Sequence, residues 1–207
     1  MSEAEPLMRE GYETCERRLG ANHVTTMTVL NNLGYVLFQL NRPDEAEPLI
    51  REALRRRREA LGADHLDTLV STGNLCELLE AQSRLADAEP VAAELYQRAI
   101  NGADAGRIPA SQADPLIARY GLCLTKLAKY EQADAPLRNA YQRLRDSSPQ
   151  SDPVLQSVIA ALADVCRHTG RPDEATRWES ELAQRRASTR ASTGPSTQPG
   201  LTPLCSR

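Results

Sequence analysis

Residues 46–52 read AEPLIRE and closely repeat residues 4–10, which read AEPLMRE. Weaker copies follow, so that the anchoring alanines of five such blocks fall at positions 4, 46, 88, 133 and 175. The successive spacings are therefore 42, 42, 45 and 42 residues. Self-similarity at a fixed period is typical of repeat architectures, in which each unit buries its apolar face against its neighbours.

A second block of sequence follows the same period. Residues 19–23 read LGANH and return at residues 61–65 as LGADH, again 42 positions later. The third unit carries three additional residues, which we assign to the irregular stretch Asn101–Ala113. Because two independent blocks share one period, chance similarity explains them poorly.

Each unit has the pattern of two helices. The first helix is expected to begin at a small polar residue such as Asp67 or Asp152, which can cap a helix N-terminus. A break at residues 41–44 places Pro43 in the first turn of the second helix, where proline costs little. The second helix ends at Leu61, and Gly62 suits a left-handed C-terminal cap. In the first helix, apolar residues recur at helical spacing, at Leu30, Leu33, Leu37 and Leu40.

Small residues mark where the two helices of a unit approach. Counting back 12 positions from the anchoring alanines gives Gly34, Cys76, Gly121 and Ala163. Such residues allow two helix backbones to pack closely. A bulky side chain at Gly34 or Gly121 is expected to overpack this contact, at a cost of about 1–3 kcal/mol.

Composition excludes several classes of protein. Hydrophobic residues make up 41% of the 207, too many for a wholly disordered chain, and the net charge of -3 gives nucleic acid or an anionic membrane no general attraction. No apolar run approaches the ~20 residues that span a bilayer. The acidic N-terminus lacks the pattern of a signal peptide. Five scattered cysteines indicate reduced thiols, and we expect a cytoplasmic protein.

The pattern Leu30-x-x-Leu33-Gly34-x-x-Leu37, followed by Ala46 and Ala53, resembles the tetratricopeptide repeat. The spacing of 42 residues and the Leu-Gly-x-Asp-His-x-x-Thr linker resemble the long variant found in kinesin light chains and many bacterial proteins. The resemblance covers about residues 3–187. It implies an all-α fold, a right-handed α-solenoid of helical hairpins whose first helices line a concave groove.

The spacing of the anchoring alanines, which we call the repeat ruler, divides the chain into units. A lone second helix at residues 3–19 is followed by hairpins at about 23–61, 65–101, 112–146 and 152–187. Residues 188–207 are rich in Ser, Thr, Pro and Gly, and we expect them to form a disordered tail. The leading helix has no first-helix partner.

The groove implied by the resemblance would be lined by side chains one step away from the packing stripe of the first helices. Its candidate partner-binding residues are Asn31, Asn32, Tyr35, Phe38, Gln39, Asn74, Glu77, Arg119, Lys126 and Arg167, with Thr28, Glu80, Asp164 and His168 on the same faces. In kinesin light chains, an asparagine at the position of Asn32 and Asn74 holds the backbone of a bound peptide. In the third and fourth units, Arg119 and Ala161 take that position.

Alternatives remain open at several of these positions. Asn32 and Asn74 could instead bridge neighbouring helices. Phe38 and Tyr35 could anchor a partner, or Phe38 could fill a gap between helices. Along the groove, the acidic Glu77 and Glu80 come before basic residues. Because the ligand would face both, we expect it to carry charges of both signs. The basic residues are Arg119, Lys126 and Arg167.

Other conspicuous residues favour structural roles. His23 and His65 recur in register, which favours a hydrogen bond to a helix end over a metal site. We expect the run Arg55–Arg58 to be a solvated outer face paired with Glu52 and Glu59. The sequence has no Gly-rich phosphate loop, His-Glu-x-x-His or Gly-x-Ser-x-Gly motif, and Cys76 and Cys166 fit small buried positions. We therefore expect neither enzymatic activity nor a cofactor.

These patterns predict a module that binds a protein or peptide in its groove. Two other hypotheses stay open. The chain could be the regulatory or scaffolding part of a larger signalling protein, such as a bacterial serine/threonine kinase. It could also form a homodimer through Leu7 and Met8 of the uncapped leading helix.

Overall fold

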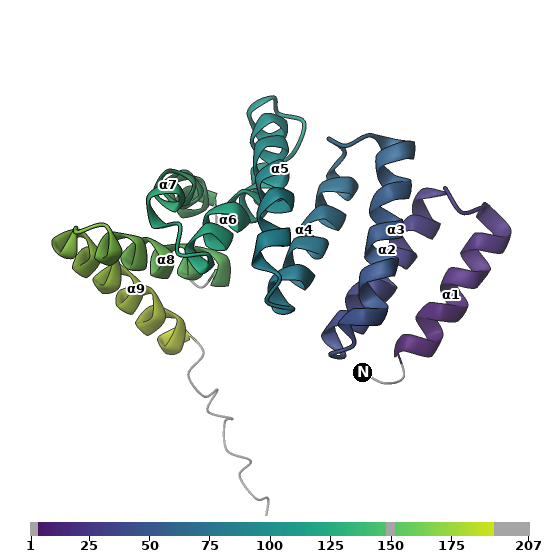
Figure 1. Cartoon of the computed structure of the whole chain (residues 1–207), viewed down its shortest axis with the longest axis horizontal. Coiled ribbons are helices and arrows are strands. Elements are labelled where there is room, and N and C mark those ends of the chain that lie inside the picture. Colours follow the sequence, from purple (N-terminus) through teal and green to yellow (C-terminus); the bar gives the residue numbers. More distant parts are fainter. Residues whose placement is uncertain (1–3, 148–151, 193–207) are drawn as a thin grey trace, which may run out of the picture.

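The computed structural model describes residues 4–147 and 152–192 of the chain. Within them the chain forms nine α-helices and no strand (Figure 1). The helices are α1 (Ala4–Leu19), α2 (Val24–Gln39), α3 (Pro43–Leu61), α4 (Leu66–Ala81), α5 (Leu85–Asp104), α6 (Ala110–Lys126), α7 (Tyr130–Ser147), α8 (Pro153–His168) and α9 (Pro172–Ser192). The predicted all-α repeat solenoid is confirmed.

The helices form an inner and an outer layer. Each first helix packs against the second helix of its own hairpin, from α2 with α3 to α8 with α9. The first helices α2, α4, α6 and α8 also contact one another in turn, whereas within the described ranges consecutive second helices do not approach so closely. The first helices therefore form the tighter, inner layer of the curved array in Figure 1.

Two histidines begin the first helices of the first two hairpins. His23 and His65 are the N-caps of α2 and α4, and each Nδ1 accepts a hydrogen bond at 3.2 Å from the backbone N–H two residues later. The structural role expected for these histidines is confirmed. The expectation that Asp67 caps α4 is wrong, because Asp67 is already the second residue of that helix. Asp152 does cap α8, accepting from the Val154 N–H at 2.8 Å.

The cap at His65 can be tested by substitution. His65→Ala is expected to lower the free energy of unfolding by about 0.5–2 kcal/mol, the usual cost of losing an N-cap acceptor. His65→Asn is expected to retain the stability of the unmodified chain, because asparagine is among the best N-cap residues. Urea denaturation of both variants measures the difference. An asparagine variant as unstable as the alanine variant would contradict the capping role.

The small positions lie at the helix crossings, as expected. A Cβ atom at Gly34 of α2 would lie 2.7 Å from the Ile50 Cγ1 atom of α3. At Gly121 of α6 it would lie 2.7 Å from the Leu137 Cγ atom of α7. At these distances, any side chain at either position forces the facing residue to shift.

Two boundaries differ from those expected. In the third unit, α5 continues to Asp104 and α6 begins at Ala110, so the extra residues form a short loop closed by Gly106 at φ +65°. Ile108 of this loop is only 5% exposed and packs over Gly102. At the other end, α9 continues to Ser192, five residues beyond the expected end of the last hairpin at residue 187. The rest of that tail, residues 193–207, lies outside the described residues.

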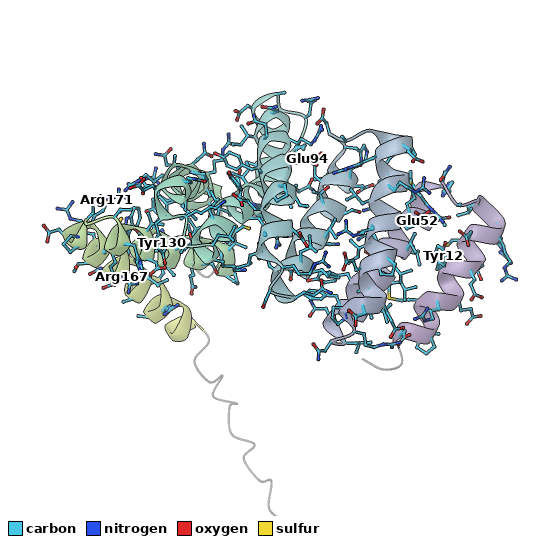
Figure 2. All side chains as sticks on the ribbon, in the orientation of Figure 1. Tyr12, Glu52, Glu94, Tyr130, Arg167 and Arg171 are labelled. Atoms are coloured by element: carbon cyan, nitrogen blue, oxygen red, sulfur yellow. The ribbon has the colours of Figure 1, made fainter. Side chains whose placement is uncertain are left out.

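A ladder of ion pairs joins consecutive second helices along one edge. The basic residue directly before each second helix contacts the acidic residue that follows the anchoring alanine of the preceding unit. The four pairs, which we call the junction ladder, are Arg42–Glu5, Arg84–Glu47 at 2.7 Å, Lys129–Glu89 at 2.7 Å and Arg171–Asp134 at 2.9 Å. Figure 2 labels Arg171 at the end of this series. Each exposed pair contributes only about 0–1 kcal/mol, so the ladder sets alignment more than stability.

Candidate partner-binding face

A hollow in the inner layer lies between α4, α6 and α8 and has a volume of about 550 Å³. We call it the inner cleft. Apolar side chains line most of it, and charged side chains lie among them. Its lining residues are Glu77, Glu80, Pro115, Leu116, Arg119, Leu122, Thr125, Lys126, Pro153, Val154, Ser157 and Ala161. A mostly apolar hollow with a few polar groups is the usual form of a binding site.

Three of the predicted groove residues line the cleft, together with Glu80 of α4. The three are Glu77, Arg119 and Lys126. Glu77 and Arg119 form an ion pair at 3.2 Å, and Glu80 and Lys126 form another at 2.6 Å. Both pairs join α4 to α6. The two signs of charge are therefore paired across a helix junction and do not form an acidic zone followed by a basic one. Arg119 also lines the cleft at the position that Asn32 and Asn74 hold in earlier units.

Asn31 does not present its side chain to a partner. It is 2% exposed, and its amide oxygen accepts hydrogen bonds from Ser71 Oγ at 2.9 Å and Asn74 Nδ2 at 3.4 Å. The position one step around α2, Asn32, is exposed. Asn74 is half-buried and bridges α4 to α2, so the bridging alternative describes its geometry. Because its side chain is buried, Asn31 is not placed to contact a partner directly.

The aromatic pair of α2 is partly buried. The rings of Tyr35 and Phe38 are tilted by 56° with centroids 6.0 Å apart, and Phe38 packs against the core formed around Leu37 and Ile50. This packing fits the gap-filling alternative for Phe38. Gln39, the next residue, is exposed at the end of the helix.

The predicted contacts of the last hairpin lie away from the inner cleft. Arg167 approaches Asp164 of its own helix at 3.7 Å and Glu179 of α9 at 3.6 Å, and Figure 2 shows it at the α8–α9 end. The His168 ring stacks on Tyr130 with centroids 4.0 Å apart. Neither residue lines the cleft.

The arginine run is only partly a solvated face. Arg55 pairs with Glu52 at 2.7 Å and with Glu59 at 2.8 Å, as expected. Arg57, however, is 3% exposed. It lies three and four residues after Leu54 and Ala53, on the buried stripe of α3, so helical geometry turns it inward. The expectation of a wholly solvated run is wrong at this position.

Arg56 ties the leading helix to the array. Its guanidinium contacts Glu52 of α3 at 2.7 Å and Glu16 of α1 at 3.2 Å, close to the Tyr12 hydroxyl. Figure 2 labels Tyr12 and Glu52 on these two helices. On the open side of α1, Leu7 is 68% exposed among charged residues such as Glu10, while Met8 packs against the core. The homodimer through this helix stays a prediction.

Sequence reasoning missed the apolar floor of the cleft. Leu116 and Val154 are absent from the expected contacts because only polar or charged side chains were assigned to the groove in the third and fourth units. The signal was present on the repeat ruler, because Ala161 is the counterpart of Asn32 and lies in the floor. Prolines 115 and 153, near the starts of α6 and α8, also line it.

The described residues contain no group of three or more His, Cys, Asp or Glu side chains that could hold a metal ion. Cys76, Cys123 and Cys166 are buried, and burial raises the pKa of the Cys123 thiol to about 11. A thiol of this kind is a poor nucleophile at neutral pH. In the same part of the chain, every helix is too short or too polar to cross a membrane.

Comparison with known proteins supports the repeat assignment. Models of the tetratricopeptide repeat match residues 26–67 and residues 160–178. No curated protein matches the chain. The fold resembles a solved structure of putative kinesin light chain TPR-like repeats from Podosopora anserina, with 14% identity, a TM-score of 0.73, and coverage of 92% of this chain and 88% of that one.

Two other solved structures have the same fold. BtubC (BKLC) from P. vanneervenii is 15% identical with a TM-score of 0.79, covering 100% of this chain and 80% of that one. A double mutant of MamA RS-1 is 17% identical with a TM-score of 0.58, covering 89% and 96%. The two matched segments lie in different hairpins of one continuous array. The chain therefore contains tetratricopeptide repeats in at least two hairpins of its array.

Proposed function

We propose that the chain binds an extended segment of a partner protein along its inner layer, and that the inner cleft receives an apolar side chain of that segment. Tetratricopeptide repeats are protein–protein interaction modules, and the cleft carries the finer proposal. Its floor is formed by Leu116, Leu122 and Val154, and the charges at its edge are paired with each other. An apolar side chain can therefore enter without separating a charge from its partner.

The same features argue against an enzyme. The buried thiols are poor nucleophiles, and the cleft has no unpaired carboxylate or histidine among its lining residues. The four cysteines of the described part are free thiols, which fits a reducing compartment such as the cytoplasm.

Filling the cleft tests the proposal. The probes are synthetic peptides of about 12 residues, roughly 40 Å when extended, with a Ser/Gly background, one central Leu, Phe or Ala, and Asp or Lys beside it. Leu and Phe peptides are expected to bind more tightly than Ala peptides in fluorescence anisotropy. Ser157→Trp is expected to weaken that binding at least about tenfold, or 1.4 kcal/mol, because Ser157 is exposed and lines the cleft.

Ser180→Trp is the matched control. Ser180 is also exposed, and both serine hydroxyls donate to the backbone carbonyl four residues earlier, at 2.8 Å for Ser157 and 2.9 Å for Ser180. Ser180 lies on α9, away from the cleft. If the two tryptophan variants bind equally well, or if the central residue has no effect on affinity, the cleft is not the binding site.

A further inference from the structure

At the junction of α3 and α4, two buried positions carry polar side chains, whereas the corresponding positions between the other units carry apolar side chains or cysteine. Arg57 of α3 is 3% exposed, and Ser71 of α4 is fully buried. On the repeat ruler, the counterparts of Ser71 are Val29, Leu116 and Val158. The counterparts of Arg57 are Cys15, Ala99, Leu144 and the exposed Arg186. Arg57 and Ser71 are hydrogen-bonded to each other, so the two polar substitutions belong to one local arrangement.

Arg57 is buried among neutral partners. Its Nη1 donates to Ser71 Oγ and to the Asp67 carbonyl, each at 2.8 Å, and its Nη2 donates to Thr28 Oγ1 at 3.0 Å. Within the described residues Arg57 forms no ion pair within 4.0 Å, and the Asp67 carboxylate attracts its charge only from a greater distance. A buried charge without a close counter-ion is a poor source of stability. A guanidinium can only donate hydrogen bonds, so Ser71 Oγ must be the acceptor in its contact with Arg57.

The hydrogen bonds run in one direction, with Arg57 donating to Ser71 and Ser71 donating to Asn31. Because Ser71 Oγ accepts from Arg57, its proton is available for an acceptor, and it donates to Asn31 Oδ1 at 2.9 Å. Turning the Asn31 amide over would place an NH2 group against that hydroxyl proton. The relay therefore holds the Asn31 oxygen toward α4.

Two groove asparagines then take opposite orientations. Asn74 reaches the Asn31 oxygen through its own Nδ2, at 3.4 Å. On the other side, Asn31 Nδ2 donates to Asn32 Oδ1 at 3.5 Å. The Asn74 oxygen and the Asn32 amino group are left as the groups available to a ligand. One is an acceptor and the other is mainly a donor.

We infer that Arg57, acting through Ser71 and Asn31, fixes which of the two groove asparagines donates and which accepts, and so selects the direction in which an extended backbone binds. An extended chain presents N–H and C=O groups in an order that reverses with its direction. The three residues are positioning residues, since none needs to touch the ligand. The choice of direction rests on the proposed function, whereas the orientation of the amides does not.

The amide orientation is tested without any ligand, by solvent-exchange NMR of the side-chain amides in the full chain. The Asn74 amide is expected to exchange more slowly than that of Asn32, which uses only its oxygen. Ser71→Ala releases the Asn31 amide, and the Asn74 amide is then expected to exchange about 2–10-fold faster, the worth of one net hydrogen bond. Burial alone cannot produce this change, because Asn74 stays equally covered.

Thr28→Val is the matched control. It also removes a hydroxyl bonded to Arg57, but Thr28 has no hydrogen bond to Asn31. It is expected to leave the exchange of both asparagines unchanged, and backbone NMR spectra verify that both variants are folded. Equal exchange of Asn32 and Asn74 in the unmodified chain, or an unchanged Asn74 rate in Ser71→Ala, overturns the relay.

The choice of direction is tested with the tightest Leu or Phe peptide and the same peptide in reversed sequence. The unmodified chain is expected to prefer one by about 3–10-fold, and Ser71→Ala to reduce that preference. Equal loss of affinity for both peptides overturns the selection of direction. If no peptide binds at all, the proposed function fails, and the exchange experiment still decides whether the relay exists.

Discussion

Leu137→Ala is expected to lower the free energy of unfolding by about 2–5 kcal/mol, because it removes a buried leucine from a closely packed core. Leu137 is fully buried in α7, within the larger core cluster that extends over the second, third and fourth hairpins. Its side chain fills the space beside Gly121 of α6. The cavity left by alanine would lie at a helix crossing, where neither helix can close it without moving.

Urea denaturation followed by circular dichroism measures this loss. Because each unit contacts only its neighbours, hydrogen exchange is expected to show reduced protection in α6, α7 and α8 and little change in α2 and α3. Leu7→Ala is the control, since Leu7 is 68% exposed and its loss is expected to stay within about 0.5 kcal/mol. A cost at Leu137 no larger than at Leu7 would mean that the crossing is not packed as described.

Gly121→Val is expected to lower the free energy of unfolding by about 1–3 kcal/mol through overpacking. The first added carbon would lie 2.7 Å from Leu137 Cγ and 3.1 Å from the Leu137 backbone nitrogen. The leucine side chain can turn away, but the backbone nitrogen yields only if α7 moves. Gly34→Val is expected to behave alike, since a Cβ there would lie 3.2 Å from the Ile50 backbone nitrogen.

Gly11→Val is the matched control for both glycines. Gly11 lies within α1, and an added Cβ would meet no atom within 4 Å. Valine exceeds glycine only slightly in helix propensity, so the change is expected to stay within about 0.5 kcal/mol. Denaturation of Gly121→Val combined with Leu137→Ala is a further check. The double variant is expected to be more stable than the two single losses predict, by about 0.5–3 kcal/mol.

Features with a local period could be predicted from the sequence. The hairpins, the glycines at the crossings and the paired role of His23 and His65 each follow from spacing along one or two helices. Even the third unit's insertion was placed in the correct loop, although α5 extends three residues past the expected Asn101. Such features depend on helix geometry alone, and the sequence records helix geometry directly.

The candidate site was harder to predict because it depends on how one unit turns relative to the next. Asn31 and Asn32 are adjacent in sequence but about 100° apart around the helix, so one is buried and the other is exposed. A small error in the assigned face therefore exchanges them. Arg57 could have been recognised, because it continues the stripe of Ile50, Ala53 and Leu54. The nearby Glu52 and Glu59 favoured a solvated face for the whole run, and the hydroxyls that accept hydrogen bonds from Arg57 come from α2 and α4.

The junction ladder also bears on how an array of this kind can change in length. In every pair the acidic residue belongs to one unit and the basic residue to the next, so each unit carries one half of two pairs. Excising residues 43–84 would remove the Glu47 and Arg84 halves together, and Lys129 would still meet Glu89 and Arg42 would still meet Glu5. Duplicating the same segment would add a complete pair. Arrays built on this rule can gain or lose whole units in evolution, or in an engineered series, without leaving a charge unmatched at the new joint.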